Sequence, residues 1–415
     1  MKLIGPFKQI IPMTGLPTKG AITDNQLEIV ADGGILVEGD RIKTIGKFDD
    51  LVKVTSLNDT EIHELKGDHT CLPGFIDAHT HICFSGSRAN DYAMRNSGKT
   101  YMEISKAGGG IWDTVTQTRK ASQETLTKGI VKRAKRHLAN GVTTIEVKSG
   151  YGLSVAEELK MLYAIKDADE LLPVDLVSTC LAAHMVPRDF EGSPAEYLEQ
   201  ITRELLPTLK AEKLTNRIDA FIEEGAFYPL LIEPYFNKAK ELGFDITVHA
   251  DQFSTGGSEV AIRYNAISAD HLEASTDIEI KLLAKSNVIA TALPGASIGL
   301  GCNFTPARKI LDAGGALAIA SDHNPGSAPM GDLLTQAAIL GTFQKLSNAE
   351  VLAGITTRAA AALNLTDRGR LSSGCLADLS IFHTADYKEI LYNQGNFKPC
   401  MVWKKGALAY NKHKH

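Results

Sequence analysis

Several features that would place a protein in a special class are missing from this sequence of 415 residues. No apolar stretch approaches the roughly 20 residues needed to span a bilayer, which argues against a membrane protein. Lysine and arginine are not clustered and the net charge is −5, which argues against a nucleic-acid-binding surface. There is no repeat of solenoid period and no low-complexity segment. The sequence therefore predicts an ordinary globular protein.

Cysteine is scarce and never occurs as CxxC, which favours free thiols in a reducing, cytoplasmic protein. The six cysteines are Cys71, Cys83, Cys180, Cys302, Cys375 and Cys400. Gly5, Pro6 and Lys8 interrupt the apolar stretch near the start, which does not read as a signal peptide. Cys83 lies near two histidines and could be a metal ligand, but we expect it to pack as a small core residue.

Strands and helices alternate between about residues 72 and 330. Eight apolar, β-branched segments follow one another from "FIDAHTHI" to "ALAIASDHN", most of them separated by helical patterns such as "SVAEELKMLYAIKDADELL". This pattern predicts an α/β fold, a (β/α)8 TIM-type barrel. A doubly wound open sheet is the alternative, but eight parallel strands are many for it and GxGxxG is absent. Residues 84–118 include "KAGGGI", and we expect a long loop there that could act as a lid.

Both ends of the chain are β-rich. Strand-forming segments surround Gly39-Asp40 near the start and Lys405-Gly406 near the end, which predicts two hairpins. No helix is predicted before residue 90. We expect the two ends to form one small β-sandwich domain beside the barrel. The expected divisions are residues 1–70 for the first part of the sandwich, 71–365 for the barrel and 366–415 for the second part.

The carboxyl ends of the predicted strands carry polar residues, and this is the face where such barrels place their chemistry. In strand order these residues are His79 and His81, Lys148 (with Tyr151 beyond it), His184, Glu223 and Glu224, His249 (with Asp251 and Gln252 beyond it), Asp270 and His271, Pro294, and Asp322.

Four of these residues form a plausible set of metal ligands. His79 and His81 are two positions apart, so they share one face of a strand. His249 and Asp322 each end an apolar strand, where a buried polar group needs a partner. Three imidazoles and one carboxylate suit Zn²⁺ or Fe²⁺ with a position left for water. The alternative is that each is a separately hydrogen-bonded core residue, and four such cases at one end of a barrel would be unusual.

These residues carry a resemblance to a known family. "PGFIDAHTH", the histidines that end strands five and six, and the aspartate that ends strand eight resemble the amidohydrolase superfamily. Within it the chain is similar to the imidazolonepropionase family over nearly its whole length. The specific segments are "FSGSRANDY", "KAGGGI", "EVKSGYGL", "AAHMVP", "VHADQF", "SADHLE" and "DHNPGSAP". One departure is His323, where the family more often has an aromatic residue.

The resemblance implies an enzyme of histidine degradation that hydrolyses the cyclic amide of 4-imidazolone-5-propanoate to N-formimidoyl-L-glutamate. The metal would lower the pKa of a bound water. The general base would be Asp322, which could then return the proton as an acid, or alternatively His271. His184 and His271 are also candidates to stabilise the oxyanion. Gln252 would orient the substrate or the water, because an amide cannot act as a base.

The same resemblance implies an anchor for the propionate. Arg88 offers a bidentate fit to a carboxylate, and Tyr151 would add a hydroxyl. Asn324, Gly326 and Ser327 follow the aspartate ligand on a turn and suit the carboxylate that forms when the ring opens. The alternative for the arginine is an ordinary surface ion pair.

The number of metal ions depends on Lys148. Related two-metal enzymes carry a carboxylated lysine at the end of strand four, whereas Lys148 falls on strand two and strand four ends in glutamates. We therefore predict one divalent ion per subunit, either zinc or iron in the Fe²⁺ or Fe³⁺ state. Lys148 would then orient a neighbour or line the pocket, and the alternative is a lysine in solvent.

The sequence is also compatible with two other functions. A related deaminase of a small heterocycle would share the metal ligands but would not need Arg88. A scaffold without catalysis would usually have lost metal ligands, and this sequence keeps all four. We expect a small-molecule substrate, no nucleic-acid or membrane partner, and, from the resemblance, a homodimer.

Overall fold

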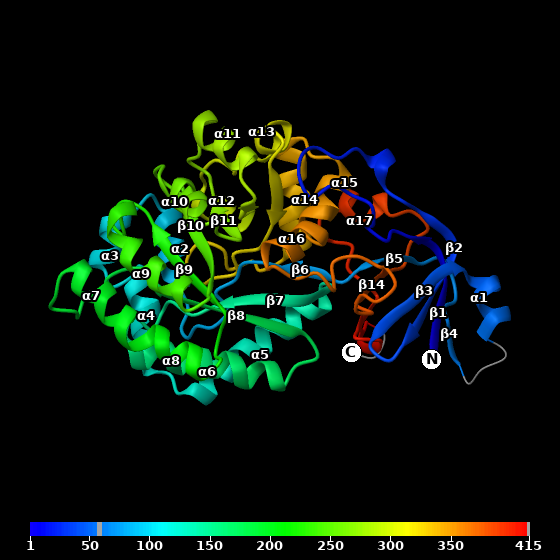
Figure 1. Ribbon diagram of the computed structural model, residues 1–415, viewed down its shortest axis with the longest axis horizontal. Helices are drawn as coiled ribbons and strands as arrows, with labels where there is room; N and C mark the ends of the chain where they lie inside the picture. Colours follow the sequence, from blue (N-terminus) through cyan, green and yellow to red (C-terminus); the bar gives the residue numbers. More distant parts are fainter. Residues whose placement is uncertain (56–59, 413–415) are drawn as a thin grey trace.

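Two separate β-sheets organise the chain in the computed structural model, which describes residues 1–55 and 60–412. One sheet forms a barrel surrounded by helices, and the other lies beside it and contains the first and the last strands of the described chain (Figure 1). This arrangement confirms the predicted (β/α)8 barrel and the separate β domain formed by the terminal segments, whose strands make one sheet where the prediction was a sandwich.

The barrel consists of eight parallel strands in sequence order. They are β6 (Phe75–Asp77), β7 (Val142–Lys148), β8 (Asp175–Ala183), β9 (Arg217–Ile222), β10 (Asp245–Ala250), β11 (Ser268–His271), β12 (Ile289–Ala292) and β13 (Ala316–Ile319). The strand β7, with the sequence VTTIEVK, is buried along its whole length. A β-branched strand buried on both faces is typical of a parallel sheet covered by helices.

The barrel closes where the chain leaves β6 and β13. Thr80 and His323 form an isolated parallel bridge. The amide of Asp322 donates to the carbonyl of His79 at 3.0 Å, and the amide of His81 donates to the carbonyl of His323 at 3.0 Å. The first and last strands are therefore joined by the segments that carry three of the four predicted metal ligands.

Helices connect the strands and cover the outside of the barrel (Figure 1). They are α2 (Ala89–Asn96), α3 (Tyr101–Lys106), α4 (Ile111–Lys120), α5 (Gln123–Ala139), α6 (Val155–Glu170), α7 (Pro194–Gln200), α8 (Leu206–Ala211), α9 (Pro229–Glu241), α10 (Gly257–Arg263), α11 (Asp277–Lys285), α12 (Pro294–Leu300), α13 (Ala307–Asp312), α14 (Leu333–Gln344), α15 (Asn348–Gly354) and α16 (Thr357–Ala362). A π-helical turn, Ile201–Leu205, joins α7 to α8. Three helices begin at capping boxes, at Ser193, Thr276 and Ser347.

The terminal sheet has the strand order β16-β15-β14-β5-β1-β2-β3, with β4 paired to β1. Its strands are β1 (Lys2–Ile10), β2 (Val30–Glu38), β3 (Arg41–Lys47), β4 (Glu61–Glu64), β5 (Thr70–Pro73), β14 (Leu379–Phe382), β15 (Met401–Lys404) and β16 (Ala407–Asn411). A short 3₁₀ turn, Asp24–Gln26, and the helix α17 (Lys388–Tyr392) complete the elements. Both predicted hairpins are present, β2–β3 and β15–β16. The divisions at residues 70 and 365 stay predictions.

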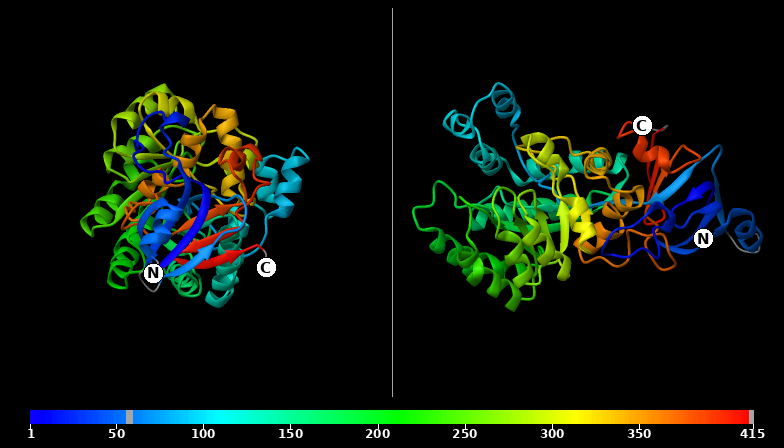
Figure 2. Two further views of the ribbon diagram at one scale, coloured as in Figure 1. Left: turned by 90° about the vertical axis from the view of Figure 1, so that its right-hand side faces the viewer. Right: turned by 90° about the horizontal axis from the view of Figure 1, so that it is seen from above.

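Two local predictions were wrong. A helix does precede residue 90, because α1 (Phe48–Thr55) places its apolar residues three and four positions apart on a half-buried face. Residues 84–118 are also more regular than a long loop, since they contain α2, α3 and most of α4. These short helices project beyond the barrel (Figure 2). These helices are short and contain few apolar residues, which hid them in the sequence.

The described residues contain no helix long and apolar enough to cross a membrane. The six cysteines are free, and all except Cys302 are buried. Cys83 lies in the barrel core, where its thiol donates to the carbonyl of Met161 at 3.8 Å. It is therefore a packing residue and not part of the groups that could hold a metal ion.

Ion pairs connect the start of β8 to the terminal sheet. Asp175 lies 2.8 Å from the ammonium of Lys404 and 2.6 Å from that of Lys405, and it also pairs with Arg368. Burial alone would raise the pKa of Asp175, but these cations outweigh it and lower the pKa to about 2. The carboxylate is therefore more stable in the folded protein than in the unfolded chain.

This cluster predicts a loss of stability in acid. Because the folded pKa of Asp175 lies below the ordinary 3.8, its contribution is complete above about pH 4 and disappears as the pH falls towards 2. We expect Asp175→Asn to lower the free energy of unfolding at pH 7 by about 2 kcal/mol. Urea unfolding between pH 2 and 7 measures this, and the difference from the unmodified protein should shrink below pH 4.

The control for this prediction is Glu241→Gln, which breaks an exposed pair with Lys238. Exposed pairs contribute little, so its free energy of unfolding should change by less than about 0.5 kcal/mol. Equal effects of Asp175→Asn and the control would show that the cluster does not stabilise the junction.

Candidate active site

The four predicted metal ligands meet at the carboxyl end of the barrel. His79 and His81 follow β6, His249 lies on β10, and Asp322 follows β13. The Nε2 atom of His81 lies 3.2 Å from Nε2 of His79 and 3.3 Å from Nε2 of His249. An oxygen of Asp322 lies 3.6 Å from Nε2 of His79 and 3.5 Å from Nε2 of His81. All four side chains are buried.

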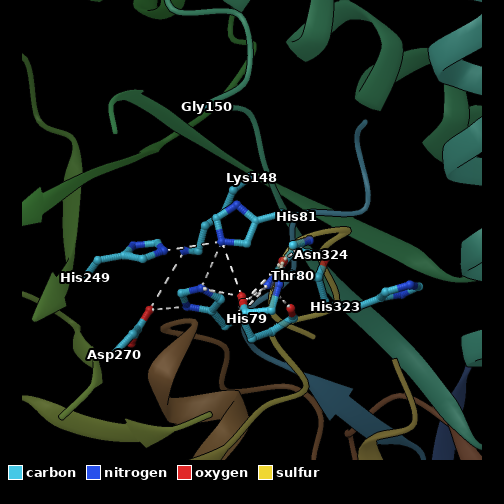
Figure 3. Close-up of polar contacts among 12 residues, drawn as sticks. His79, Thr80, His81, Lys148, Gly150, His249, Asp270, His323 and Asn324 are labelled. Carbon is cyan, nitrogen blue, oxygen red and sulfur yellow. Dashed lines mark hydrogen bonds and ion pairs between the residues drawn. The ribbon is translucent and has the colours of Figure 1, made fainter. Parts of the chain in front are cut away.

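Two buried carboxylates fix the orientation of two of these imidazoles. Nδ1 of His79 lies 2.7 Å from Asp270 and Nδ1 of His249 lies 2.9 Å from Asp219. A carboxylate accepts hydrogen bonds, so each Nδ1 carries the proton and each Nε2 presents a lone pair. Figure 3 shows the rings of His79, His81 and His249 facing one another.

The buried ammonium of Lys148 forms ion pairs with both of these carboxylates and with a third, that of Glu146. Its ammonium lies 2.8 Å from Glu146, 2.8 Å from Asp219 and 3.8 Å from Asp270, and it is fully buried. Burial opposes its charge, but Asp219, Glu146 and Asp270 outweigh that effect and raise the pKa of Lys148. The alternative of a lysine in solvent is therefore wrong. The predicted position on the second barrel strand is confirmed, and the lysine orients its neighbours.

This arrangement fits a metal ion. Burial lowers the pKa of His79, His81 and His249, the last to about 4, so the three imidazoles are neutral. Lone pairs of neutral imidazoles at such short separations repel one another unless a cation lies between them. Bonds of about 2.0–2.1 Å to a tetrahedral ion place neighbouring ligand atoms about 3.3–3.4 Å apart, which is close to the separations found here.

Comparison with known proteins agrees with this centre. The model of the amidohydrolase family matches residues 70–409. The chain belongs to the amidohydrolase family.

Curated relatives cover nearly the whole amidohydrolase chain. It is 40% identical over 386 residues to "Imidazolonepropionase" of Acinetobacter baumannii (strain AB307-0294), which spans 92% of this chain and 95% of the relative. It is 38% identical over 401 residues to "Imidazolonepropionase" of Alkaliphilus oremlandii (strain OhILAs), which spans 96% and 94%.

Solved structures share the fold at low identity. The chain matches a triazine hydrolase from Arthrobacter aurescens with a TM-score of 0.77 and 16% identity, covering 99% of this chain and 94% of the other. It matches the guanine deaminase of E. coli with a TM-score of 0.74 and 15% identity, covering 99% and 100%. These two likenesses establish the architecture of the amidohydrolase chain.

Two further histidines of the amidohydrolase site lie next to the predicted metal ligands, and their pKa values shift in opposite directions. His271, at the end of β11, lies close enough to His79 and His249 to form a group with them. Burial would lower its pKa, but Glu273 outweighs this and raises the pKa of His271. His184 stacks on His81 with ring centroids 5.7 Å apart, and burial lowers its pKa.

The tautomer of His184 is fixed by its neighbour. Its Nδ1 donates to the carbonyl of Gly150 at 2.9 Å, so its Nε2 carries a lone pair when the ring is neutral. Gly150 has φ +105°, and a Cβ there would lie 3.1 Å from Nδ1 of His184. A glycine is therefore needed both for the backbone conformation and for the close approach.

Arg88 lies in the half-buried segment after β6 and not on the open surface. Its side chain is 10% exposed, pairs with Asp91 and donates to the hydroxyl of Thr114 at 3.3 Å. It faces the turn after β13, because a Cβ on Gly326 would lie 3.3 Å from its Nη1. Arg88 therefore does form an ion pair, but not the surface ion pair of the alternative interpretation. Its side chain is largely buried and lies beside the predicted substrate-binding residues.

The turn after β13 is tied to Asp322, one of the predicted metal ligands. The amide of Asn324 donates to Asp322 at 2.9 Å, and its Oδ1 accepts the amides of Gly326 and Ser327 at 2.8 Å each. Figure 3 shows Asn324 beside His79 and His81, whereas the ring of His323 points away from them. His323 instead lies 2.9 Å from His137 of α5.

The remaining predicted residues line or brace the site. Tyr151 is buried, with its ring 5.8 Å from that of His81. Gln252 is half-buried in the turn after β10. Asp251 accepts from the amide of Ser258 at 3.1 Å and from the hydroxyl of Ser275 at 2.7 Å, so it braces this loop.

Sequence reasoning missed the buried carboxylates of Glu146 and Asp219, which pair with Lys148 beside the predicted metal ligands. Both lie inside apolar strands, in "VTTIEVK" and "RIDAFI". A charged residue in an apolar strand needs a buried partner, so the sequence does indicate that each carboxylate is paired. The sequence could not show that both share one lysine.

Proposed function

We propose that the chain hydrolyses the cyclic amide of 4-imidazolone-5-propanoate to N-formimidoyl-L-glutamate, as a step of histidine degradation. The observation that carries this proposal is the 38–40% identity to proteins named imidazolonepropionase over more than nine-tenths of the chain. The test is an ultraviolet assay that follows the loss of freshly made imidazolonepropionate, with metal quantification on the same sample. A metal-loaded preparation that leaves this compound unchanged would refute the proposal.

The proposed metal ligands are His79, His81, His249 and Asp322, and the proposed ion is a single zinc or iron per subunit. When bound, the ion supplies an activated water and polarises the ring carbonyl. The donor set suits both metals, so elemental analysis of the purified protein decides between them.

Asp322 and His271 are the proposed proton-handling residues. One oxygen of Asp322 faces the histidines while the other accepts from Asn324, so the carboxylate is held in place to take a proton from water. It then returns the proton to the departing ring nitrogen. Glu273, 3.4 Å from Nδ1 of His271, raises the pKa of that histidine, and we assign His271 to donate to the oxyanion that develops on the ring carbonyl.

His184 and Gln252 are proposed to orient the ring. The lone pair on Nε2 of neutral His184 accepts a hydrogen bond more readily than it stabilises an oxyanion. We therefore assign it to a ring N–H of the substrate. Gln252 lies three residues beyond His249, in the turn after β10, and its side-chain amide can donate or accept a hydrogen bond.

Arg88 and Tyr151 are the proposed anchor for the propionate, with Asn324, Gly326 and Ser327 at the carboxylate formed by ring opening. For Arg88→Ala we predict a KM raised by roughly 10- to 100-fold, because a charge-assisted hydrogen bond is worth about 1.5–3 kcal/mol. Steady-state kinetics with the imidazolone acid measures this.

The matched variant is Arg88→Lys, which keeps a cation for Asp91 but loses the bidentate fork. Arg88→Lys should have the melting temperature of the unmodified protein, while its KM stays raised as in Arg88→Ala. An unchanged KM in both variants would move the anchor elsewhere and would favour a neutral substrate, as for a deaminase of a small heterocycle. A homodimer and a cytoplasmic location complete the proposal, and light scattering of the purified protein tests the former.

A further inference from the structure

A cavity of about 550 Å³ borders the candidate active site. It lies between α5, the segment after β6 and the turn after β13, and its wall includes Arg88, Asn324 and Gly326. Asn324 touches the metal ligand Asp322 on one side and lines this cavity on the other. Asn324 therefore borders both the cavity and the proposed metal centre.

The cavity is strongly basic. Arg88, Lys132, Arg133 and Arg136 line it, and no aspartate or glutamate is among its lining residues. Of these four cations only Arg88 forms an ion pair within the described part of the chain, with Asp91. The chain as a whole is acidic, with a net charge of −5. Cations gathered around one hollow without neutralising partners attract an anionic ligand.

Two of the guanidinium groups are held in place by the protein. Nη1 of Arg133 donates to the carbonyl of Ile82 at 2.9 Å, and its guanidinium lies 3.5 Å above the ring of Phe84. Nη2 of Arg136 donates to the carbonyl of Met330 at 2.7 Å. Carbonyl partners fix these groups without neutralising their charge, so a ligand meets an ordered positive surface.

A glycine within α5 leaves space for one of the guanidinium groups that line the cavity. Gly129 lines the cavity, and a Cβ at this position would lie 2.8 Å from Nη1 of Arg133. Glycine inside a helix costs about 1 kcal/mol relative to alanine. Its place here leaves room for the guanidinium to lie across the helix towards the cavity.

We propose that this cavity binds a carboxylate of the ring-opened dicarboxylic acid as the product leaves the metal centre. This inference rests on the proposed function, in which hydrolysis converts an acid with one carboxylate into an acid with two. Arg88 serves the first carboxylate, and Lys132, Arg133 and Arg136 serve the one that moves outward. The ligand class is therefore a five-carbon dicarboxylate chain.

The test compares Lys132→Glu with Lys135→Glu in metal-loaded protein. Both lysines are exposed on α5 and the substitutions are identical, but only Lys132 lines the cavity. The probe is glutarate, titrated calorimetrically, with the neutral diamide glutaramide as a second titrant. We expect Lys132→Glu to weaken glutarate binding at least 10-fold and Lys135→Glu by less than twofold, with equal metal contents and no binding of glutaramide.

Glutarate binding that is equally strong in the two variants would overturn the proposal, as would equal binding of glutaramide. Product inhibition gives the second measurement, and its constant should rise in Lys132→Glu alone. A fall of kcat/KM in Lys132→Glu without a change in product inhibition would show substrate steering and also contradict product binding.

The calorimetric measurement needs no turnover, which keeps the two proposals distinguishable. If the enzyme fails to act on the imidazolone acid but Lys132→Glu still weakens glutarate binding, the function fails and the anion site stands. If the enzyme acts on that acid and glutarate binding is unaffected, the anion site fails and the function stands.

Discussion

His249→Ala is expected to abolish both metal binding and turnover. His249 supplies one of three neutral imidazole nitrogens, 3.3 Å from its neighbour on His81, and alanine offers no ligand atom in its place. The remaining donors would bind an ion weakly, so kcat/KM should fall by at least about 1000-fold. Elemental analysis after gel filtration and the ultraviolet assay measure the two losses.

The matched control for this prediction is His383→Ala. His383 is an exposed histidine beyond β14, near His69 and away from the barrel site. This variant should keep its metal and its activity within about twofold, since exposed positions outside a site contribute little. Stoichiometric metal together with full turnover in His249→Ala would show that the centre is built from other residues.

Lys148→Met is expected to destabilise the fold by about 3–5 kcal/mol, the usual result of removing one partner from a buried ion pair. Its ammonium is the cation shared by Glu146 and Asp219 at 2.8 Å each, and methionine leaves their negative charges without compensation. The loss should be larger without metal, because a bound cation offsets part of this charge. Urea unfolding of metal-free and metal-loaded protein measures both values.

The double variant Lys148→Met/Glu146→Gln tests the cause of this loss. It removes one of the uncompensated charges while Asp219 still holds His249, so part of the lost stability should return. If Lys148→Met alone costs less than about 1 kcal/mol, or if the double variant is as unstable as the single one, the lysine does not neutralise these carboxylates.

Much of the centre could be predicted because barrel topology turns sequence order into position. The order of the eight strands predicts that His79, His249 and Asp322 lie at one end of the barrel, and the structure brings them together. The count also separated Lys148 on strand two from the strand-four lysine of two-metal relatives. Each inference needed only the strand number and the direction of the chain.

Other features were beyond the sequence because they depend on contacts between distant segments. Nothing in "SGSRAND" reveals that Arg88 is half-buried beside Asp91 and Gly326, or that it shares a cavity with α5. The short helices α1, α2 and α3 were missed for a different reason. A helix of eight residues or fewer spans only about two turns, so even the regular apolar spacing of α1 is too short to distinguish a helix from a loop.

The strands β5 and β6 are neighbours in the chain, and one edge of each pairs with a segment that comes much later in the sequence. β5 pairs with β14, and the segment after β6 pairs with the segment after β13. During synthesis on the ribosome both strands therefore emerge with one open edge, which invites pairing with other chains. The barrel can close only once His323 has been made, and the terminal sheet is complete only with β16 (Ala407–Asn411), so both edges stay open for most of synthesis.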